Sequence, residues 1–467
     1  MFHRTVFRRG LCLMFLLSTC PAVFAQQKIL TLKEAVQNAL QNYGTIKAKA
    51  NYAKASAALV KEAKREYLPN LNVSAQNDFG TVNSQYGPSY GFNGYSVSSS
   101  GPILTGQNWN AAFGGLYLAN LNWDFFSFGK AKERVKVAQS QQTLDQSDLV
   151  QEQFQQEVRV SGAYLNLLAS QQLGVSQQNN LKRALALRNV IVARVKSGLN
   201  PGVDSSLANA EVSSAQIALT NAQDVVQQQG NQLAQYTTLV PIDFLLDSSF
   251  VSQIPRTLDT VTTFNLSKHP VLLYYQNRIG ISAEREKYYR TFSYPTFSLF
   301  NIFQSKGSGF NSYTLNQTLY TQNYFSGVNP TRSNYLLGIG MSWNITSPLR
   351  VHEQVRAQQF TSEGLRNEYE LVNQQLSAQL ILSKTRIENA LRNYREAPVG
   401  LKAASDAFQQ KTVLYRNGLA TIVDVTQALY TLNRAETDRD IAYNNVWQAL
   451  LYKAAATGDF GIFFNEF

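Results

Sequence analysis

The chain has 467 residues and a formal net charge of +11 at pH 7, but only 16% of its residues are charged. Its basic residues form no run with interleaved aromatics, so neither composition nor charge indicates nucleic-acid binding. Both cysteines lie within the first 20 residues, the histidines are isolated, and no nucleophile–base pair emerges. No enzyme activity, metal site or cofactor is therefore predicted.

The first 25 residues have the layout of a secretory signal peptide. A basic stretch is followed by an apolar one, Leu11 to Leu17, and by a small-residue cleavage motif that ends at Ala25. We therefore predict that the segment 1–25 is removed on export. Lipid attachment at Cys20 is the alternative, although Thr19 and Pro21, which flank this cysteine, fit a lipid-attachment motif poorly.

The remainder of the chain is internally duplicated. Pairs of identical residues recur at an offset of 220 positions (198 to 418): Gly198 and Gly418, Leu199 and Leu419, Asp204 and Asp424, Trp123 and Trp343. Tyr67-Leu68-Pro69 corresponds to Ser293-Tyr294-Pro295 at an offset of 226 (69 to 295). We therefore predict a first repeat at 26–240, an equatorial segment at 241–260 near the mid-length of the helices, and a second repeat at 261–467.

Both repeats show the same order of patterns. The first contains a half-length helix at Leu32–Glu66, a strand-loop-strand segment at 67–125 with strands Leu71–Phe79 and Ala111–Asp124 around the loop Gly80–Asn110, a long helix at 127–198 and a half-length helix at 204–236. The second contains a half-length helix at Val261–Thr291, a strand-loop-strand segment at 294–346 with strands Phe297–Gln304 and Asn334–Thr346 around the loop Ser305–Ser333, a long helix at 347–417, a half-length helix at 424–456 and a C-terminal tail.

The second strand of each repeat alternates apolar and polar residues. In the first repeat one face carries Phe113, Tyr117, Leu121 and Trp123, and the other carries Asn120, Asn122 and Asp124. This alternation is typical of a barrel strand between lipid and a water-filled lumen, and Trp123 and Trp343 are then anchors at the membrane interface. A half-buried strand of a soluble sheet shows the same alternation. No apolar stretch after the signal approaches the ~20 residues of a spanning helix, so crossing a bilayer requires a closed barrel.

The helical stretch after each second strand is exceptionally long. About 70 residues at 1.5 Å per residue span about 105 Å. Pro398 is the only helix breaker inside either stretch, and Ser127 and Ser347 are the predicted N-caps. A helix of this length needs partners along it, so we expect coiled-coil packing against the two half-length helices. The turns after Gly198 and Gly418 then lie at the end farthest from the strands.

These features resemble the TolC-type outer-membrane efflux family. The resemblance rests on the duplication, the strand-loop-strand segments and the turn motifs Gly198-Leu199 with Asp204 and Tyr415 to Asp424. It implies a mainly α-helical chain with a membrane β-barrel part. Three chains of four strands each would form a 12-stranded barrel in the outer membrane of a Gram-negative-type bacterium, and the long helices would form a periplasmic tunnel. The residues alone indicate oligomerisation, because four strands cannot close a barrel around water.

The resemblance implies a duct that conducts exported small molecules or proteins. A periplasmic adaptor would dock on the hairpin turns at Gly198, Leu199, Gly418 and Leu419, and an inner-membrane pump, either proton-driven or ATP-driven, would supply the energy. An autonomous porin is one alternative, but it leaves the long helices without a purpose. A structural coiled-coil protein of the cell envelope is another, but it leaves the alternating strands unexplained.

The resemblance also assigns residues to a gate at the periplasmic entrance. Asp424 occupies the first acidic gate position, whereas Gln427 stands at the second one, so the entrance should be less acidic. Tyr415 matches a tyrosine that holds the turns closed through the other hairpin, where Asp204 is its counterpart. Ala420 stands where some members have an arginine that adds to this latch. Helix capping is the alternative role for both aspartates.

Overall fold

The computed structural model describes residues 29–84, 103, 105–240, 244–247, 250, 253–256, 265–314 and 317–466. These residues form two compact units. The hairpin unit comprises the described parts of 1–37, 163–254 and 396–444, and the sheet unit comprises those of 38–162, 255–395 and 445–467. Most described residues are helical, and no described helix is long and apolar enough to cross a membrane. The predicted signal peptide with Cys20, and most of the predicted loop Gly80–Asn110, lie outside the described residues.

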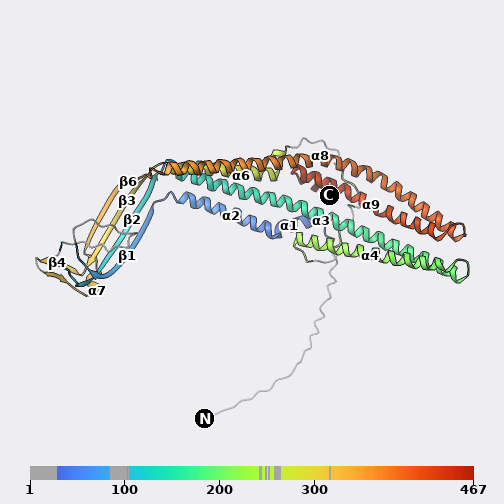
Figure 1. Ribbon diagram of the computed structural model, residues 1–467, viewed down its shortest axis with the longest axis horizontal. Coiled ribbons are helices and arrows are strands. Elements are labelled where there is room, and N and C mark those ends of the chain that lie inside the picture. The colour runs from blue at the N-terminus through green and yellow to red at the C-terminus, as the bar shows by residue number, and fades with distance from the viewer. Residues whose placement is uncertain are drawn as a thin grey trace, which may run out of the picture. The chain divides into compact units, whose positions relative to one another are not determined.

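The sheet unit contains a four-stranded antiparallel sheet in the order β1-β2-β3-β6 (Figure 1). The strands are β1 (Asn70–Thr81), β2 (Ala111–Phe126), β3 (Thr296–Ser308) and β6 (Arg332–Ser342). Odd-numbered residues pair with odd-numbered residues across the strands, up to a β-bulge near the end of β2. Tyr117, for example, pairs with Ala75 of β1 and with Ser305 of β3. Because successive side chains point to opposite faces, odd positions share one face and even positions the other.

The two faces of the sheet differ in polarity. In β1 the odd face carries Leu71, Val73 and Phe79, which are all exposed, and the even face carries Asn70, Asn72, Ser74, Gln76 and Asp78. In β6 the odd face presents the exposed side chains of Tyr335, Leu337, Ile339 and Met341. In these two edge strands, one face is therefore mainly apolar and the other mainly polar.

The segment between β3 and β6 is not the plain loop that was predicted at Ser305–Ser333. It continues β3 and then forms β4 (Phe310–Thr314), β5 (Gln317–Tyr320) and the short helix α7 (Tyr324–Val328). α7 lies against β2 and β3 at two glycines: a Cβ at Gly115 would lie 2.8 Å from the Val328 carbonyl oxygen, and Gly307 is equally crowded. A composition rich in Gly, Ser and Asn predicts a loop, whereas the packing depends on which glycines pair across strands.

The helix that directly precedes the strand-loop-strand segment starts at equivalent positions in the two repeats. The continuous helix predicted at Leu32–Glu66 is instead α1 (Leu32–Asn42) and α2 (Gly44–Arg65), and the one predicted from Val261 is α6 (Pro270–Arg290), preceded by the 3-10 turn η2 (Leu266–Lys268). Tyr43 and His269, 226 positions apart, are the N-caps of α2 and α6, with φ −62° and ψ 126° or 128°. These extended residues interrupt the helix, and the proline after His269 favours that conformation.

The two long helices are continuous. They are α3 (Lys130–Lys196) and α8 (Ser347–Arg416), and Pro398 lies inside α8 without ending it. α3 begins three residues after Ser127, its predicted N-cap, because Phe128 and Gly129 have φ values of 49° and 86° that a helix does not allow. α8 begins at Ser347 itself, its predicted N-cap, and the Ser347 hydroxyl donates to the Phe292 carbonyl (3.0 Å).

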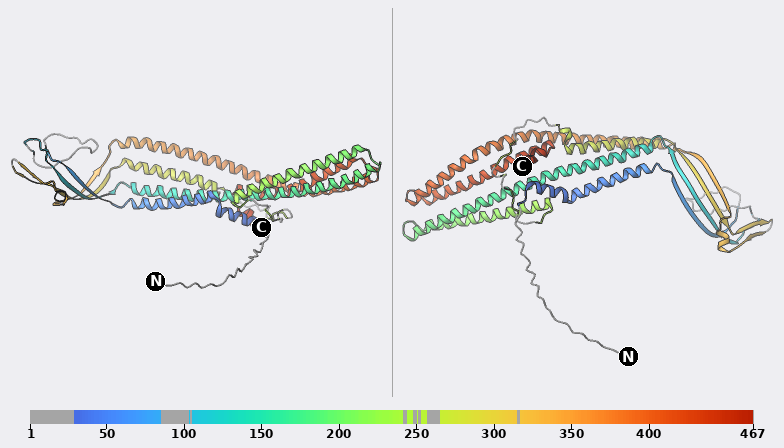
Figure 2. Two further views of the ribbon diagram at one scale, coloured as in Figure 1. Left: turned by 90° about the horizontal axis from the view of Figure 1, so that it is seen from below. Right: turned by 180° about the vertical axis from the view of Figure 1, so that it is seen from behind.

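In the hairpin unit, α3 with α4 (Gly202–Thr237) and α8 with α9 (Ile422–Thr457) form two helical hairpins whose turns lie at the same end (Figure 2). Two apolar clusters join the four helices: Leu181, Ala184, Ala215, Leu219 and Leu429 form one, and Ile191, Ala208, Tyr415, Ile422 and Val425 form the other. α4 and α9 end at equivalent residues, Thr238 and Gly458, which both have positive φ. The repeats therefore share helix ends as well as sequence motifs.

Described residues of the equatorial segment are bonded to α3. The buried Tyr164 hydroxyl donates to the Leu30 carbonyl (2.8 Å) and accepts from the Asp247 N–H (3.0 Å), and its burial raises the pKa of Tyr164 to about 12. Gln171 donates to the Phe244 carbonyl (2.8 Å). These bonds hold the residues before α1 and the connection between the repeats on the same part of α3.

Candidate functional site

The two hairpin turns have the same backbone structure. Gly198 and Gly418 adopt the left-handed conformation, with φ of 74° and 78°, and each donates to the carbonyl three residues earlier. The next residue, Leu199 or Leu419, donates to the carbonyl five residues earlier, at 2.9 Å in both turns. These two bonds form the Schellman motif that ends a helix. Both leucine side chains stay exposed, at 69% and 74%, so each turn presents an apolar group at its end.

A hydrogen-bonded cluster connects the two hairpins beside the turns. Asn200 donates through Nδ2 to the Tyr415 hydroxyl (3.1 Å) and to the Asp204 carboxylate (2.7 Å). Tyr415 is 2% exposed and Asp204 is 9% exposed. Burial and the nearby Asp204 carboxylate raise the pKa of Tyr415. The two residues that the resemblance pairs therefore lie in one cluster, with an asparagine side chain between them.

Arg194 completes this cluster from α3. Its Nε donates to Asn200 Oδ1 (2.8 Å), and its Nη1 donates to the carbonyl oxygen of Arg416 on the other hairpin (2.7 Å). Its guanidinium also lies over the Tyr415 ring, 5.6 Å from the centroid, where a cation–π attraction acts. We call Arg194, Asn200, Asp204 and Tyr415 the latch cluster. It places a guanidinium between the hairpins although position 420 is alanine.

Asp424 lies in a different arrangement, a capping box at the start of α9. Its carboxylate accepts from the Thr421 N–H (3.0 Å) and hydroxyl (2.7 Å), and Thr421 Oγ1 accepts from the Asp424 N–H (3.3 Å). Lys411 of α8 donates to the same carboxylate (3.1 Å). The bonds from Thr421, and then the one from Lys411, lower the pKa of Asp424 to about 2. The N-cap is thus Thr421, and Asp424 is its partner one turn later.

The corresponding aspartates of the two repeats therefore differ in environment. Asp204 is buried against the other hairpin, whereas the Asp424 side chain is 39% exposed beside Lys411. Gln427 is exposed on α9, and its counterpart at the offset of 220 is Leu207. Within the described part of the chain, no three His, Cys, Asp or Glu side chains gather as metal ligands would.

The sequence patterns assign no role to four residues of these two clusters, which are Arg194, Asn200, Thr421 and Lys411. Arg194 and Asn200 lie inside the first turn motif, but only the packing of the hairpins shows that they reach Tyr415. The spacing from Thr421 to Asp424 is that of a capping box, which is a readable signal. Lys411 lies 13 residues before its aspartate, a separation that no short motif covers.

The two predicted interface tryptophans make equivalent bonds in the sheet unit. The Trp123 indole donates to the Tyr67 carbonyl (2.9 Å), and the Trp343 indole donates to the Ser293 carbonyl (3.1 Å). Tyr67 and Ser293 are themselves equivalent at the offset of 226. Each repeat thus holds its indole at the junction between the sheet and the preceding helix, whose last residues are Arg65 and Arg290.

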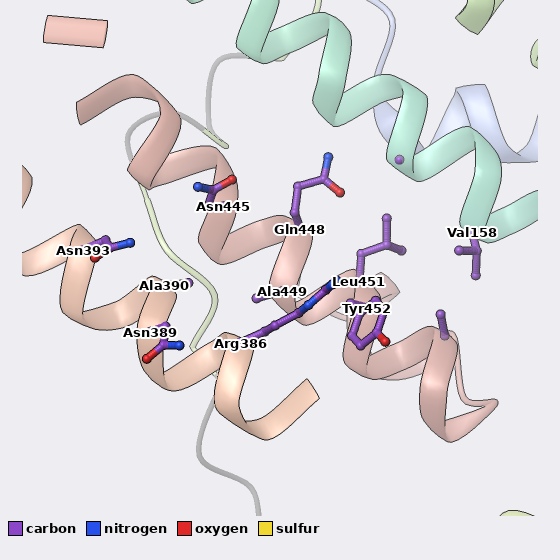
Figure 3. A pocket seen from close by; sticks show the side chains of 12 residues that line it. Val158, Arg386, Asn389, Ala390, Asn393, Asn445, Gln448, Ala449, Leu451 and Tyr452 are labelled. Atoms are coloured by element: carbon purple, nitrogen blue, oxygen red, sulfur yellow. The ribbon is translucent and has the colours of Figure 1, made fainter. Parts of the chain in front are cut away.

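A cavity of about 530 Å³ lies between α8, α9 and α3 in the sheet unit (Figure 3). The Arg386 guanidinium is stacked over the Tyr452 ring, 4.1 Å from its centroid. Amide side chains dominate the rest of the polar lining: Asn389, Asn393, Asn445 and Gln448. None of the predicted gate or turn residues lines it, and its groups are generic hydrophilic ones without a nucleophile.

Comparison with protein families gives a match to part of the chain. Residues 116–238, about a quarter of the chain, match the family described as outer membrane efflux protein. This match confirms the resemblance that the sequence motifs indicated, since the matched family is described as one of outer membrane efflux proteins. No curated protein matches the chain in sequence.

Solved structures share the fold over most of the chain. The outer membrane protein VceC of Vibrio cholerae is 17% identical with a TM-score of 0.71, covering 92% of this chain and 96% of that one. The CmeC outer membrane channel of Campylobacter jejuni is 14% identical with a TM-score of 0.71, covering 91% and 85%. The MtrE outer membrane channel of Neisseria gonorrhoeae, solved in an open state, is 15% identical with a TM-score of 0.68, covering 92% and 89%.

Proposed function

We propose that this chain, whose residues 116–238 match the outer membrane efflux protein family, is one subunit of a homotrimeric duct that conducts exported molecules from the periplasm through the outer membrane. The observation that carries the proposal is the amphipathic four-stranded sheet with two open edges. The hairpin turns and the latch cluster supply the periplasmic end of the same duct.

The sheet can enter a bilayer only as part of a larger closed barrel. The outer edges of β1 and β6 pair with no other strand of the described chain, and unpaired backbone groups are costly in lipid. Closing the barrel with other copies satisfies both edges. The odd face, with Leu71, Val73 and Ile339, then meets lipid, and the even face, with Asn72 and Gln76, meets water.

The hairpin turns fit a docking role for a periplasmic adaptor. Leu199 and Leu419 project from turns of the same backbone geometry, and Val203 and Val423 add a second pair of exposed apolar side chains at the start of the next helices. Apolar anchors on a rigid backbone are typical of protein interfaces. We propose that the adaptor binds both turns of each subunit and connects the duct to an inner-membrane pump.

The latch cluster supports a gated entrance. Arg194, Asn200 and Tyr415 connect the hairpins by bonds that must break if the second hairpin moves away from the first. Each bond contributes on the order of 1 kcal/mol, so a few of them hold a closed state that an adaptor can still overcome. Asp424 remains a gate candidate, since its exposed carboxylate can face its copies in a trimer.

Conductance of the purified chain tests the proposal. The full-length chain, extracted from outer membranes and added to planar bilayers, should migrate as a trimer in native mass measurement and give discrete, low-conductance channels. Native complexes captured through a tag should contain an adaptor and a pump. A monomer that forms no channel would contradict the proposal, and channels without any adaptor in captured complexes would favour an autonomous porin.

A further inference from the structure

Basic side chains gather next to the tryptophan of the second repeat. A cavity of about 640 Å³ between α6 and α8 is lined by Arg290, His352 and Arg356. Ser293 also lines it, and the Ser293 carbonyl is the group to which the Trp343 indole donates. The cavity therefore borders the indole on the side of the helices.

This cavity is not lined by residues of the polar face of the sheet. A second cavity, of about 470 Å³, is lined by Thr296 and Ser342 of the even, polar face together with Arg350. On α8, Arg350 and His352 are two residues apart, which places them about 200° around the helix axis from each other. The two cavities are neighbours that share Tyr294 and Val351, but only the second is lined by residues of the polar face, whereas His352 and Arg356 line the first alone.

The first repeat carries basic residues at the same three positions. Lys64 corresponds to Arg290 at the offset of 226, and Lys132 and Lys136 correspond to His352 and Arg356 at the offset of 220. Lys64 and Lys132 are exposed, and Lys136 is half-buried. Trp123 stands at the place of Trp343. A basic trio beside an interface tryptophan is therefore a repeated feature, and we call the two trios the basic collar.

The carboxylates near the collar leave the first trio more positive. Lys136 pairs with Glu133 (2.8 Å), whereas neither Lys64 nor Lys132 has an ion pair among the described residues. In the second trio Arg290 pairs with Glu286 (2.6 Å), and His352 lies 3.9 Å from Glu353. Arg356 lies over the Phe360 ring. Two lysines are thus uncompensated in the first repeat and one arginine in the second.

We propose that the basic collar binds the phosphate groups of anionic phospholipids in the periplasmic leaflet of the outer membrane. The inference rests on the proposed function, because it needs the apolar face of the sheet to lie in that membrane. Indoles sit at the headgroup level of a bilayer, and basic side chains directly beyond them meet the lipid phosphates. The exposed apolar side chains of Leu337, Ile339 and Met341, on the sheet side of Trp343, are suited to the adjacent acyl region.

Lipid retention measures this binding directly. The full-length trimer is reconstituted into nanodiscs of equal parts phosphatidylglycerol and phosphatidylcholine, and the lipids that stay bound are counted by native mass spectrometry. Phosphatidylglycerol should be enriched, and the enrichment should fall with added salt because charges near a surface are screened. The triple variant Lys64→Gln, Lys132→Gln, Lys136→Gln should lower the enrichment by up to about fivefold for each uncompensated lysine.

Matched variants separate the collar from net charge. Arg392→Gln, Arg395→Gln, Lys402→Gln removes the same charge from exposed positions of α8 and should leave the enrichment unchanged. Arg290→Gln, Arg356→Gln should reduce it less than the lysine variant does, since Glu286 already compensates Arg290.

Equal retention of the two lipids by the native chain would overturn the inference, as would equal loss in the collar and control variants. Conductance in pure phosphatidylcholine bilayers is read separately. Channels there without lipid enrichment would leave the duct standing and the collar refuted, whereas a chain that enters neither bilayer would refute both.

Discussion

The carboxylate of Asp424 is bound by its own helix and still exposed to solvent. Three copies of it near a trimer axis would repel one another, and a bound cation relieves such repulsion. We therefore expect Asp424→Ala to weaken the block of conductance by divalent cations in planar bilayers. Lys411→Gln should strengthen the block, because its ammonium group neutralises the carboxylate at 3.1 Å. Gln427→Asp should strengthen it as well, by adding a second acidic ring.

The pKa of Asp424 supplies a further check on this prediction. With a value of about 2, the carboxylate stays ionised through the physiological range, so cation block should not titrate between about pH 5 and pH 8. Thr421→Ala is the control for helix capping: it removes the N-cap at a cost of about 1 kcal/mol but keeps the charge. If Asp424→Ala and Thr421→Ala both lower thermal stability and neither changes cation block, Asp424 only caps its helix.

His269 makes the stability of the sheet unit depend on pH. Its Nδ1 accepts from the Val271 N–H (3.2 Å), its Nε2 lies 3.1 Å from the Ala455 carbonyl oxygen, and burial lowers the pKa of His269 below 6.5. Because the folded pKa is the lower one, the neutral side chain contributes its full stability above pH 6.5, and this contribution is lost as pH falls through the folded pKa. Protonation would also remove the Nδ1 acceptor.

We expect amide hydrogen exchange at the start of α6 to accelerate, relative to the rest of the sheet unit, as pH falls below 6.5. His269→Asn keeps an N-cap acceptor without a titrating group, so its relative exchange rate should be flat over the same range. Equal pH dependence in the native chain and in this variant would show that His269 is not the titrating group.

Among the elements, the two hairpins are held together by the latch cluster. Tyr415→Phe removes one acceptor and should favour opening by about 1 kcal/mol, seen as a higher mean conductance in planar bilayers. Arg194→Ala should have a larger effect, because it removes two hydrogen bonds and the contact over the Tyr415 ring. Arg188→Ala is the matched control: this arginine bonds to Asn209 within its own hairpin (2.7 Å) and should not change conductance. Equal conductance in all three variants would exclude the latch.

Helix periodicity and internal repetition predict most of the architecture. Long helical patterns, with no breaker in α3 and only Pro398 in α8, predict both helices well, because each residue added to a helix makes one more local hydrogen bond. The sequence did not predict the interruptions at Tyr43 and His269, because one extended N-cap residue hardly changes the apolar pattern of the helix. The sequence did not predict α7 either, because its position depends on glycines of two neighbouring strands. The Arg194 contacts bridge 222 positions to Arg416, and no local pattern reports a contact of that kind.

For the whole molecule, the open edges of β1 and β6 are the decisive feature. If copies close a barrel, β6 of one subunit pairs with β1 of the next, and antiparallel pairing places residues of the same face opposite each other. The odd-face residues Val73 and Ile339 are both exposed and lie in these edge strands. The chain has no cysteine beyond position 20, so introduced thiols have no competitors outside the predicted signal peptide.

Cysteine pairing between these edges tests the closed barrel. Val73→Cys is combined in turn with a cysteine at Tyr335, Leu337, Ile339 or Met341, and each double variant is oxidised in isolated outer membranes. At least one combination should give disulfide-linked trimers on a denaturing gel, because facing strand residues lie within the 4.4–6.8 Å Cα separation that a disulfide requires. Leu336→Cys and Gly338→Cys point to the polar face and should not link. Linking by the even positions, or by none of the odd ones, would mean that β1 and β6 do not meet as neighbours, and the barrel would have to close by another pairing.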